Sequence, residues 1–301
     1  TQVTSSASWS GRRYFAGVVY NTLMWVMGGD DGSFKNDVWS SSDGSTWSQA
    51  TAAAAWSTRD NPACVVFNDL MWLIGGDDWA QPQDVWSSAD GSTWTLVTAS
   101  AAWTDRAGHT AVVYNNLMWV VGGTDLSVYY NDVWSSADGV TWTEATSDAA
   151  WSGRRGHSSV LFNSGMWVVG GYDGTSYYNG VWATGVVVPG SDWDQVTASA
   201  SWSGRHAHAS VVFNNRMWVM GGTAGSNMID VWSSSDGLVW TQIASTASWS
   251  ARNYPVGVVH NNLMWVMGGY DGSTNFNDVW SSSDGATWTE TTAAAGWSTR
   301  N

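Results

Sequence analysis

The sequence predicts an all-β protein, a six-bladed β-propeller with four antiparallel strands in each blade. The first observation is tryptophan, which supplies 26 of the 301 residues and recurs at fixed positions. The second is a unit of 47 to 51 residues that repeats six times. The third is that short β-branched and aromatic runs alternate with Asn-Asn, Gly-Gly and Asp-Gly turns, without helical periodicity. Four-stranded units of this length, repeated radially, make propeller blades.

Each unit starts with the motif Trp-x-x-Arg and continues to an Asp-Val-Trp motif. The arginines are Arg12, Arg59, Arg106, Arg154, Arg205, Arg252 and Arg300. The aspartates are Asp37, Asp84, Asp132, Asp230 and Asp278, and the fourth unit has Gly180 instead. Arg and Asp at matched repeat positions predict structural ion pairs, or arginines stacked on tryptophan.

Four short strands are expected in each unit. In the first unit they are residues 17–20, residues 23–27 ending at Gly-Gly, residues 37–40, and residues 46–49. Asp43-Gly44 fits a tight hairpin between the third and fourth strands, because that turn needs a positive φ. In the fourth unit, residues 182–193 replace this hairpin with a longer segment, so we expect a loop that projects from the face.

Four tryptophans in each of six units account for 24 of the 26. Burying one indole removes roughly 150–250 Å² from water, so these positions are expected to form the core between blades. Trp79 and Trp297 are the two that remain. Trp79 lies in an Asp-rich segment outside the repeat pattern, so the repeat gives no structural reason for it.

Composition excludes several classes of protein. A chain that is 44% hydrophobic and 14% aromatic is too apolar to be disordered. A net charge of −14 argues against nucleic acid or an anionic membrane as partner. The single cysteine, Cys64, excludes an internal disulfide framework and any multi-cysteine metal site. No stretch approaches the roughly 20 consecutive apolar residues that span a bilayer.

The fourth unit carries the clearest family resemblance. Residues 154–160, then Met-Trp and Gly-Gly in residues 166–171, and then the Trp that ends the blade resemble the kelch motif. The resemblance covers essentially the whole chain, although kelch repeats usually carry Tyr where this chain has the Trp of Met-Trp. The hairpin at residues 41–47 also resembles the aspartate box of sialidases, shortened by one residue. That box is a fold element away from the sialidase active site and implies no sialidase activity.

Three successive units place histidine at one position, His109, His157 and His208. Neighbouring imidazoles could hold a transition metal. The resemblance favours the other interpretation, because kelch repeats commonly carry this histidine and adjacent blades usually hold equivalent atoms beyond ligand distance. We therefore expect no metal site here.

One face of the propeller is predicted to bind a ligand. In antiparallel blades the loops between strands 4 and 1 and between strands 2 and 3 emerge on the same side. The 2–3 loops differ from unit to unit, and variation on a rigid scaffold is where function usually lies. Aromatic rings beside carboxylates suit a glycan or a cationic protein patch, and adjacent aspartates could take calcium, although Asp-Asp-Gly is more often a solvated turn. The candidate ligand-binding residues are Asp30, Asp31, Phe34, Asp77, Asp78, Trp79, Asp125, Tyr129, Tyr172, Asp173, Tyr270 and Asp271.

The resemblance implies either a binding module or an enzyme, since kelch propellers include galactose oxidase, a sialic-acid mutarotase, plant specifier proteins and many protein-binding domains. Cys64 lies in a repeat position and does not reproduce the Cys–Tyr cross-link of galactose oxidase. No titratable cluster departs from the repeat, so we expect neither catalytic residues nor a cofactor. The expectation is a binding, adhesion or assembly module for a protein or glycan, and the alternative is a carbohydrate-active enzyme (mutarotase or oxidase-like). The acidic, lysine-poor composition favours an extracellular or cell-surface location.

Residues 1–301 are expected to form a single propeller, closed by one of two duplicate segments. Residues 289–301 repeat residues 1–13. The C-terminal copy should supply strand 4 of the last blade, because a short turn joins it to strand 3. Trp9 should take the Trp-x-x-Arg site, which displaces residues 1 to 5 and 297–301. The surplus indicates a window cut from a longer repeat array.

Overall fold

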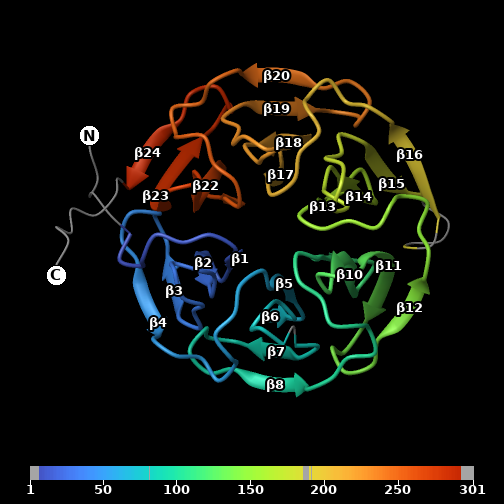
Figure 1. Cartoon of the computed structure of the whole chain (residues 1–301). Coiled ribbons are helices and arrows are strands. Elements are labelled where there is room, and N and C mark those ends of the chain that lie inside the picture. Colours follow the sequence, from blue (N-terminus) through green and yellow to red (C-terminus); the bar gives the residue numbers. More distant parts are fainter. Residues whose placement is uncertain (1–6, 81, 186–189, 191, 293–301) are drawn as a thin grey trace.

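The computed structural model describes residues 7–80, 82–185, 190 and 192–292. In these residues 24 strands form six four-stranded antiparallel sheets, which stand as blades around a central axis (Figure 1). The described residues contain no helix, and so none that could cross a membrane. The all-β, six-bladed propeller predicted from the sequence is confirmed.

The strands follow one another within each blade from the axis outward. Blade 1 holds β1 (Ala16–Tyr20), β2 (Leu23–Met27), β3 (Val38–Ser41) and β4 (Ser48–Thr51). Blade 2 holds β5 (Ala63–Phe67), β6 (Leu70–Ile74), β7 (Val85–Ser88) and β8 (Thr95–Thr98). Blade 3 holds β9 (Thr110–Tyr114), β10 (Leu117–Thr124), β11 (Tyr129–Ser136) and β12 (Thr143–Thr146).

The second half of the ring repeats this order. Blade 4 holds β13 (Ser158–Phe162), β14 (Gly165–Val169), β15 (Val181–Thr184) and β16 (Trp193–Thr197). Blade 5 holds β17 (Ala209–Phe213), β18 (Arg216–Met220), β19 (Val231–Ser234) and β20 (Thr241–Ala244). Blade 6 holds β21 (Val256–His260), β22 (Leu263–Tyr270), β23 (Asn275–Ser282) and β24 (Thr289–Thr292). The innermost strand of each blade contacts those of both neighbours, which closes the ring.

The fourth strand begins two residues later than the sequence predicts. The Asp43 carboxylate accepts hydrogen bonds from the N–H groups of Ser45 and Thr46, both at 2.8 Å, and the Ser41 hydroxyl accepts one from Gly44 at 2.8 Å. These bonds hold the chain in the turn up to Trp47. Gly44 has the expected positive φ of 75°.

Gly-Gly does not end the second strand in every blade. In blades 3 and 6 the pairing of strands 2 and 3 continues past the two glycines, with a register shift at Val121–Gly123 and at Met267–Gly269. The sequence analysis expected Gly-Gly to be the end of the strand in all units. A bulge absorbs the extra residue there, so the ladder resumes beyond it.

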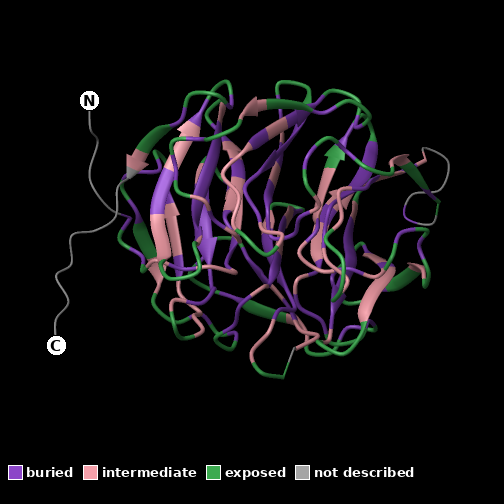
Figure 2. Ribbon diagram, turned by 45° about the horizontal axis from the view of Figure 1, so that its top comes forward, coloured by how far each residue is buried: buried purple, intermediate pink, exposed green. Residues whose placement is uncertain are grey.

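The predicted tryptophan core between blades is present for three of the four repeat positions, with buried residues concentrated on the strands (Figure 2). Trp56 of the Trp-x-x-Arg set is 1% exposed and packs edge-to-face on Trp94, with centroids 6.0 Å apart. The Val-Trp set is only half-buried. In the five blades with an Asp-Val-Trp motif the indole N–H donates to the Asp two residues earlier, as Trp39 does to Asp37 at 2.8 Å.

The Trp of each Met-Trp pair packs against a turn glycine of the next blade. A Cβ atom added at Gly91 would overlap the six-membered ring of Trp25. The same contact recurs for Trp72 with Gly139, Trp119 with Gly190, Trp167 with Gly237, and Trp218 with Gly285. The hairpin glycine is therefore needed for close approach as well as for its positive φ.

The predicted arginine network forms as bidentate ion pairs. Arg106 is 0% exposed and its guanidinium donates to both oxygens of Asp132, at 2.6 and 2.7 Å, and to the Gly122 carbonyl at 2.9 Å. Four other arginines make the same pair, Arg12 with Asp37, Arg59 with Asp84, Arg205 with Asp230, and Arg252 with Asp278. The arginine also stacks on its own tryptophan, as Arg106 does on Trp103 at 5.8 Å.

The last blade takes its outer strand from the C-terminal copy of the duplicated segment. β24 pairs with β23, and Trp9 is buried against Trp47 at 5.8 Å. Both observations agree with the expected closure. Residues 1–6 and 293–301, with Trp297 and Arg300, lie outside the described residues, as do residues 186–189 and 191 of the fourth-unit loop.

Candidate functional site

Six pairs of residues, each directly after a Trp-x-x-Arg arginine, surround one end of the central axis. The first residue of each pair bridges to the 2–3 loop of its own blade, so the 4–1 and 2–3 connections share a face as predicted. These bridges are Arg13 with Asp30, Asp60 with Asp77, Ala107 with Thr124, Arg155 with Tyr172, His206 with Thr223, and Asn253 with Tyr270. We call the second residues the collar, which consists of Tyr14, Asn61, Gly108, Gly156, Ala207 and Tyr254.

All six collar residues have a left-handed φ, between 50° and 61°. This conformation lets the N–H of one collar residue donate to the carbonyl of the preceding one. Four such bonds of 2.7 to 2.9 Å are formed, by Asn61, Gly156, Ala207 and Tyr254. Among the described residues the steps from Gly108 to Asn61 and from Tyr14 to Tyr254 lack this bond. The collar is thus a partial backbone ring around the end of the channel.

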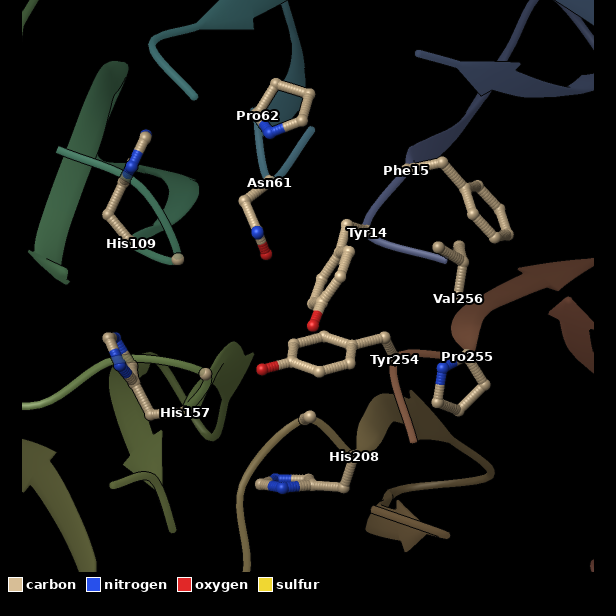
Figure 3. Close-up of a pocket in the computed structure, with 13 residues that line it drawn as sticks. Tyr14, Phe15, Asn61, Pro62, His109, His157, His208, Tyr254, Pro255 and Val256 are labelled. Carbon is tan, nitrogen blue, oxygen red and sulfur yellow. The ribbon is translucent and has the colours of Figure 1, made fainter. Parts of the chain in front are cut away.

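The collar is asymmetric in its side chains. Tyr14, Asn61 and Tyr254 extend toward the axis, and the two tyrosine rings touch with centroids 3.9 Å apart (Figure 3). The other collar residues, in blades 3, 4 and 5, have only hydrogen or a methyl group as side chain. The collar lines two cavities of about 130 Å³ and 170 Å³. Both cavities are lined by Tyr14, Asn61, Gly108, Gly156 and Tyr254.

Below the collar, His109, His157 and His208 line the smaller cavity. Each packs against a Gly-Gly glycine of the preceding blade; a Cβ atom added at Gly75 would lie 3.0 Å from the His109 ring. Burial, and then the charge of Arg106, lower the pKa of His109 to about 3, so the ring is neutral. Among the described residues no three His, Cys, Asp or Glu side chains are grouped so that they could hold a metal ion. The ring of each of these histidines contacts the backbone at a Gly-Gly pair in the wall of the channel.

Two ionisable groups in and beside the larger cavity, Asp60 and His206, have shifted pKa values. Asp60 is 7% exposed, and burial, together with the negative charges of Asp77 and Asp30, raises its pKa to about 7. The Nε of Arg155 is buried without a hydrogen-bond partner. His206 lies beside it, and burial followed by the Arg155 charge lowers the pKa of His206 to about 4.

The aromatic residues predicted as ligand contacts meet across blade boundaries. Trp79 is 87% exposed and stacks on Phe34 of the neighbouring loop, with centroids 4.9 Å apart and planes at 18°. Tyr129 packs edge-to-face on Tyr172 at 6.1 Å. Tyr270 instead lies under the Arg13 guanidinium at 4.3 Å. The structure therefore brings four of the five predicted rings together in two pairs on the predicted face.

The predicted acidic residues mainly stabilise their own loops. Asp30 is buried and pairs with Arg13 at 3.1 Å, and Asp31 pairs with Lys35 at 2.9 Å. The remaining five, Asp77, Asp78, Asp125, Asp173 and Asp271, each accept a backbone N–H from a residue two positions later. At Asp173, burial is outweighed by bonds from Tyr178 and the Ser176 N–H, which hold the pKa at about 2. Loop N–H groups thus use oxygens that calcium would need.

Sequence reasoning missed the collar and its preceding residues, including Tyr14, Asp60, Arg155, His206 and Tyr254. A signal was available in the repeat itself. The pair reads Arg-Tyr, Asp-Asn, Ala-Gly, Arg-Gly, His-Ala and Asn-Tyr, directly after an arginine that does not change. The pair lies in the 4–1 connection of the predicted binding face, but the candidate residues were taken from the 2–3 loops alone.

With six four-stranded blades and a Trp-x-x-Arg and Gly-Gly repeat, the molecule is a kelch-type propeller. A family model described as the KLHDC2/KLHL20/DRC7 Kelch-repeats domain matches residues 63–249, and one described as the Kelch motif matches residues 251–281. The chain belongs to the kelch-repeat family. No match was found among curated proteins. Kelch propellers generally bind protein partners and are usually non-enzymatic binding or scaffold modules.

Proposed function

We propose that this propeller is an extracellular or cell-surface binding module whose partner contacts the face of the 2–3 and 4–1 loops. The observation that carries the proposal is the exposed stack of Trp79 on Phe34. An indole that is 87% exposed buries little of its surface in the fold and therefore contributes little to stability for its size. Covering it with a partner would remove up to roughly 150–250 Å² from water.

The surroundings of Trp79 extend this surface. Leu126 and Val128, in the 2–3 loop of blade 3, are 60% and 50% exposed. Leu126 and Asp77 line the same cavity, which places the blade 3 loop beside that of blade 2. Exposed apolar side chains on neighbouring loops are typical of a binding surface.

The chemistry of the face favours a protein partner with apolar and basic side chains. Arg and Lys stack well on exposed rings, and the chain's charge of −14 attracts a basic partner. A glycan is the second candidate, because the nearly parallel rings of Phe34 and Trp79 offer a flat apolar surface for a sugar. Binding of either kind at a cell surface would serve adhesion or assembly without catalysis.

A single substitution tests the proposal. Trp79→Ala should weaken binding of the labelled protein to cells or to immobilised glycans by tenfold or more, with little change in melting temperature. The control is Val239→Ala, since Val239 is also exposed, at 68%, but lies in a hairpin between strands 3 and 4, on the opposite face. Equal binding by the wild type and Trp79→Ala would refute the proposed surface. Turnover of a sugar by the wild type would instead establish a carbohydrate-active enzyme.

A further inference from the structure

The larger cavity at the collar lies at blade 3, where the pair of residues after the Trp-x-x-Arg arginine is smallest. The five other blades carry Arg, Asp, His or Asn at the first position of the pair, and blade 3 carries Ala107 followed by Gly108. The aliphatic part of Arg155 covers Gly108; a Cβ atom added there would lie 3.3 Å from the Arg155 Cβ. The cavity of about 170 Å³ is therefore bounded by blade 2 on one side and by blade 4 on the other.

Opposite charges line this cavity without neutralising each other. Asp60 and Asp77 come from blade 2, and Arg155 comes from blade 4. The ion pairs formed among the described residues do not include Arg155, and its Nε is buried with no hydrogen-bond partner. The partly buried Arg155 guanidinium lies over the Tyr129 ring at 5.9 Å, and this contact leaves its Nε–H without an acceptor, which is unfavourable for a buried donor.

The acidic wall is also incompletely satisfied. Asp60 accepts one side-chain hydrogen bond, from the Asn61 amide at 3.1 Å, and Asp77 accepts one from the Trp79 N–H at 2.8 Å. Arg13, the other arginine near Asp60, already pairs with Asp30. A cation that entered beside Asp60 and Asp77 would therefore meet the Asp77 carboxylate and, above about pH 7, the Asp60 carboxylate, with little competition.

The floor and rim supply further polar groups. Tyr14 and Tyr254 line the cavity and direct their hydroxyl groups toward the axis (Figure 3). The Gly108 N–H is one of the two collar N–H groups that do not donate a hydrogen bond to the collar carbonyl of the preceding blade. It lines the same cavity as Arg155, so both are donors available to one anion.

We propose that this cavity binds a small zwitterion of the α-amino acid class. Its ammonium group lies toward Asp60 and Asp77, and its carboxylate accepts hydrogen bonds from Arg155 and the Gly108 N–H. A ligand with only one charge would leave the opposite wall unpaired, whereas a zwitterion pairs both. The cavity volume equals that of several water molecules, which matches a small amino acid rather than a peptide. The proposal does not rest on the partner surface at Trp79.

The experiment compares three ligands of nearly equal size at tens of millimolar. L-Alanine carries both charges, L-lactate lacks the ammonium group, and L-alaninamide lacks the carboxylate. Binding is measured as chemical-shift changes of ¹³C-labelled tyrosine, since Tyr14 and Tyr254 line the cavity. Alanine should bind about tenfold more tightly than either analogue. No binding of alanine, or equal binding of all three, would overturn the proposal.

Matched variants locate the site. Arg155→Met and Asp60→Asn should each weaken alanine binding about tenfold or more, whereas Arg216→Met and Asp194→Asn, which change exposed residues outside the cavity, should leave it unchanged. Ala107→Leu keeps both charged side chains but fills the cavity, so it should also abolish alanine binding. It remains a test of the site if a charge variant fails to fold. Alanine binding that survives Ala107→Leu and either charge variant would place the ligand elsewhere. Trp79→Ala should not affect alanine binding, which separates this result from the test of the partner surface.

Discussion

Trp265 of blade 6 lies flat against Gly44 of blade 1, so the seam between the last and first blades has the same contact as the other five. A Cβ atom at Gly44 would overlap carbon atoms of the six-membered ring of Trp265. The ring is therefore closed by packing of the same kind at every seam. Among the described strands none is exchanged between blades, because each sheet consists of four consecutive strands.

Gly44→Ala should destabilise the protein strongly, because the methyl group collides with Trp265 in addition to straining a φ of 75°. The control is Gly225→Ala, which has a φ of 89° but nothing within 4 Å of the added atom. Urea unfolding should show a loss of about 2–4 kcal/mol for Gly44→Ala and roughly 1 kcal/mol for the control. Similar losses for both variants would mean that backbone strain, and not the seam contact, determines the effect.

Trp72→Phe and Trp56→Phe should differ in cost although both indoles are buried. The Trp72 N–H donates to the Phe67 carbonyl at 2.9 Å, whereas the Trp56 N–H has no hydrogen-bond partner. Both variants lose packing, and only Trp72→Phe leaves a buried carbonyl unpaired, which adds about 1 kcal/mol or more. The free energies of unfolding of the two variants, measured side by side, check this. A larger loss for Trp56→Phe would contradict it.

Gly180→Asp should stabilise the protein. Arg154 is buried in blade 4 without the Asp partner of the other blades, and burial lowers its pKa to about 10. A Cβ atom at Gly180 meets only ordinary contacts of 3.5 Å or more, so the carboxylate can be accommodated. A paired guanidinium should add about 1–3 kcal/mol to the free energy of unfolding. Gly180→Asn is the uncharged control, and a gain as large with Asn would exclude the ion pair as its cause.

Asp60 should make stability fall as the pH rises from about 4 to about 7. Its pKa of about 7 in the folded protein lies above its ordinary value of 3.8, because of burial and then of Asp77 and Asp30. In this window the unfolded chain releases the proton while the folded protein retains it, so folding becomes less favourable until pH 7 and then levels off. The effect is on the order of a few kcal/mol, reduced by the nearby Arg13.

Asp60→Asn removes this titration while keeping the side chain's shape. The melting temperature of Asp60→Asn minus that of the wild type should therefore rise from pH 4 to pH 7 and stay constant above. Asp194→Asn, in the exposed outer strand of blade 4, should keep the wild-type profile. A difference between Asp60→Asn and the wild type that does not change with pH would show that Asp60 is ionised throughout.

Much of the fold could be predicted because the repeat fixes burial and turn chemistry together. The Trp-x-x-Arg and Asp-Val-Trp motifs identified the ion pairs, and Trp79 was singled out because it broke the pattern. The start of the fourth strand was wrong by two residues, because capping by Asp43 depends on side-chain geometry that spacing does not reveal.

The candidate site was harder to predict, for a physical reason. Residues that face the axis come from blades some 50 residues apart, so nothing local shows that Asp60 and Arg155 share a cavity. Sequence also favoured the aspartates of the 2–3 loops as ligand contacts. Their carboxylates prove to be bonded largely to their own loops, as at Asp125 with the N–H groups of Ser127 and Val128.

The collar combines a constant backbone with side chains that differ from blade to blade. Its backbone has one conformation in all six blades, with side chains as different as those of Tyr14, Asn61 and Gly108. The residue before each collar position varies as freely, from Arg13 to Ala107, while it keeps the same bridge to the 2–3 loop. If the collar binds the proposed zwitterion, its specificity could be redesigned at these six adjacent pairs without altering a strand register or a seam.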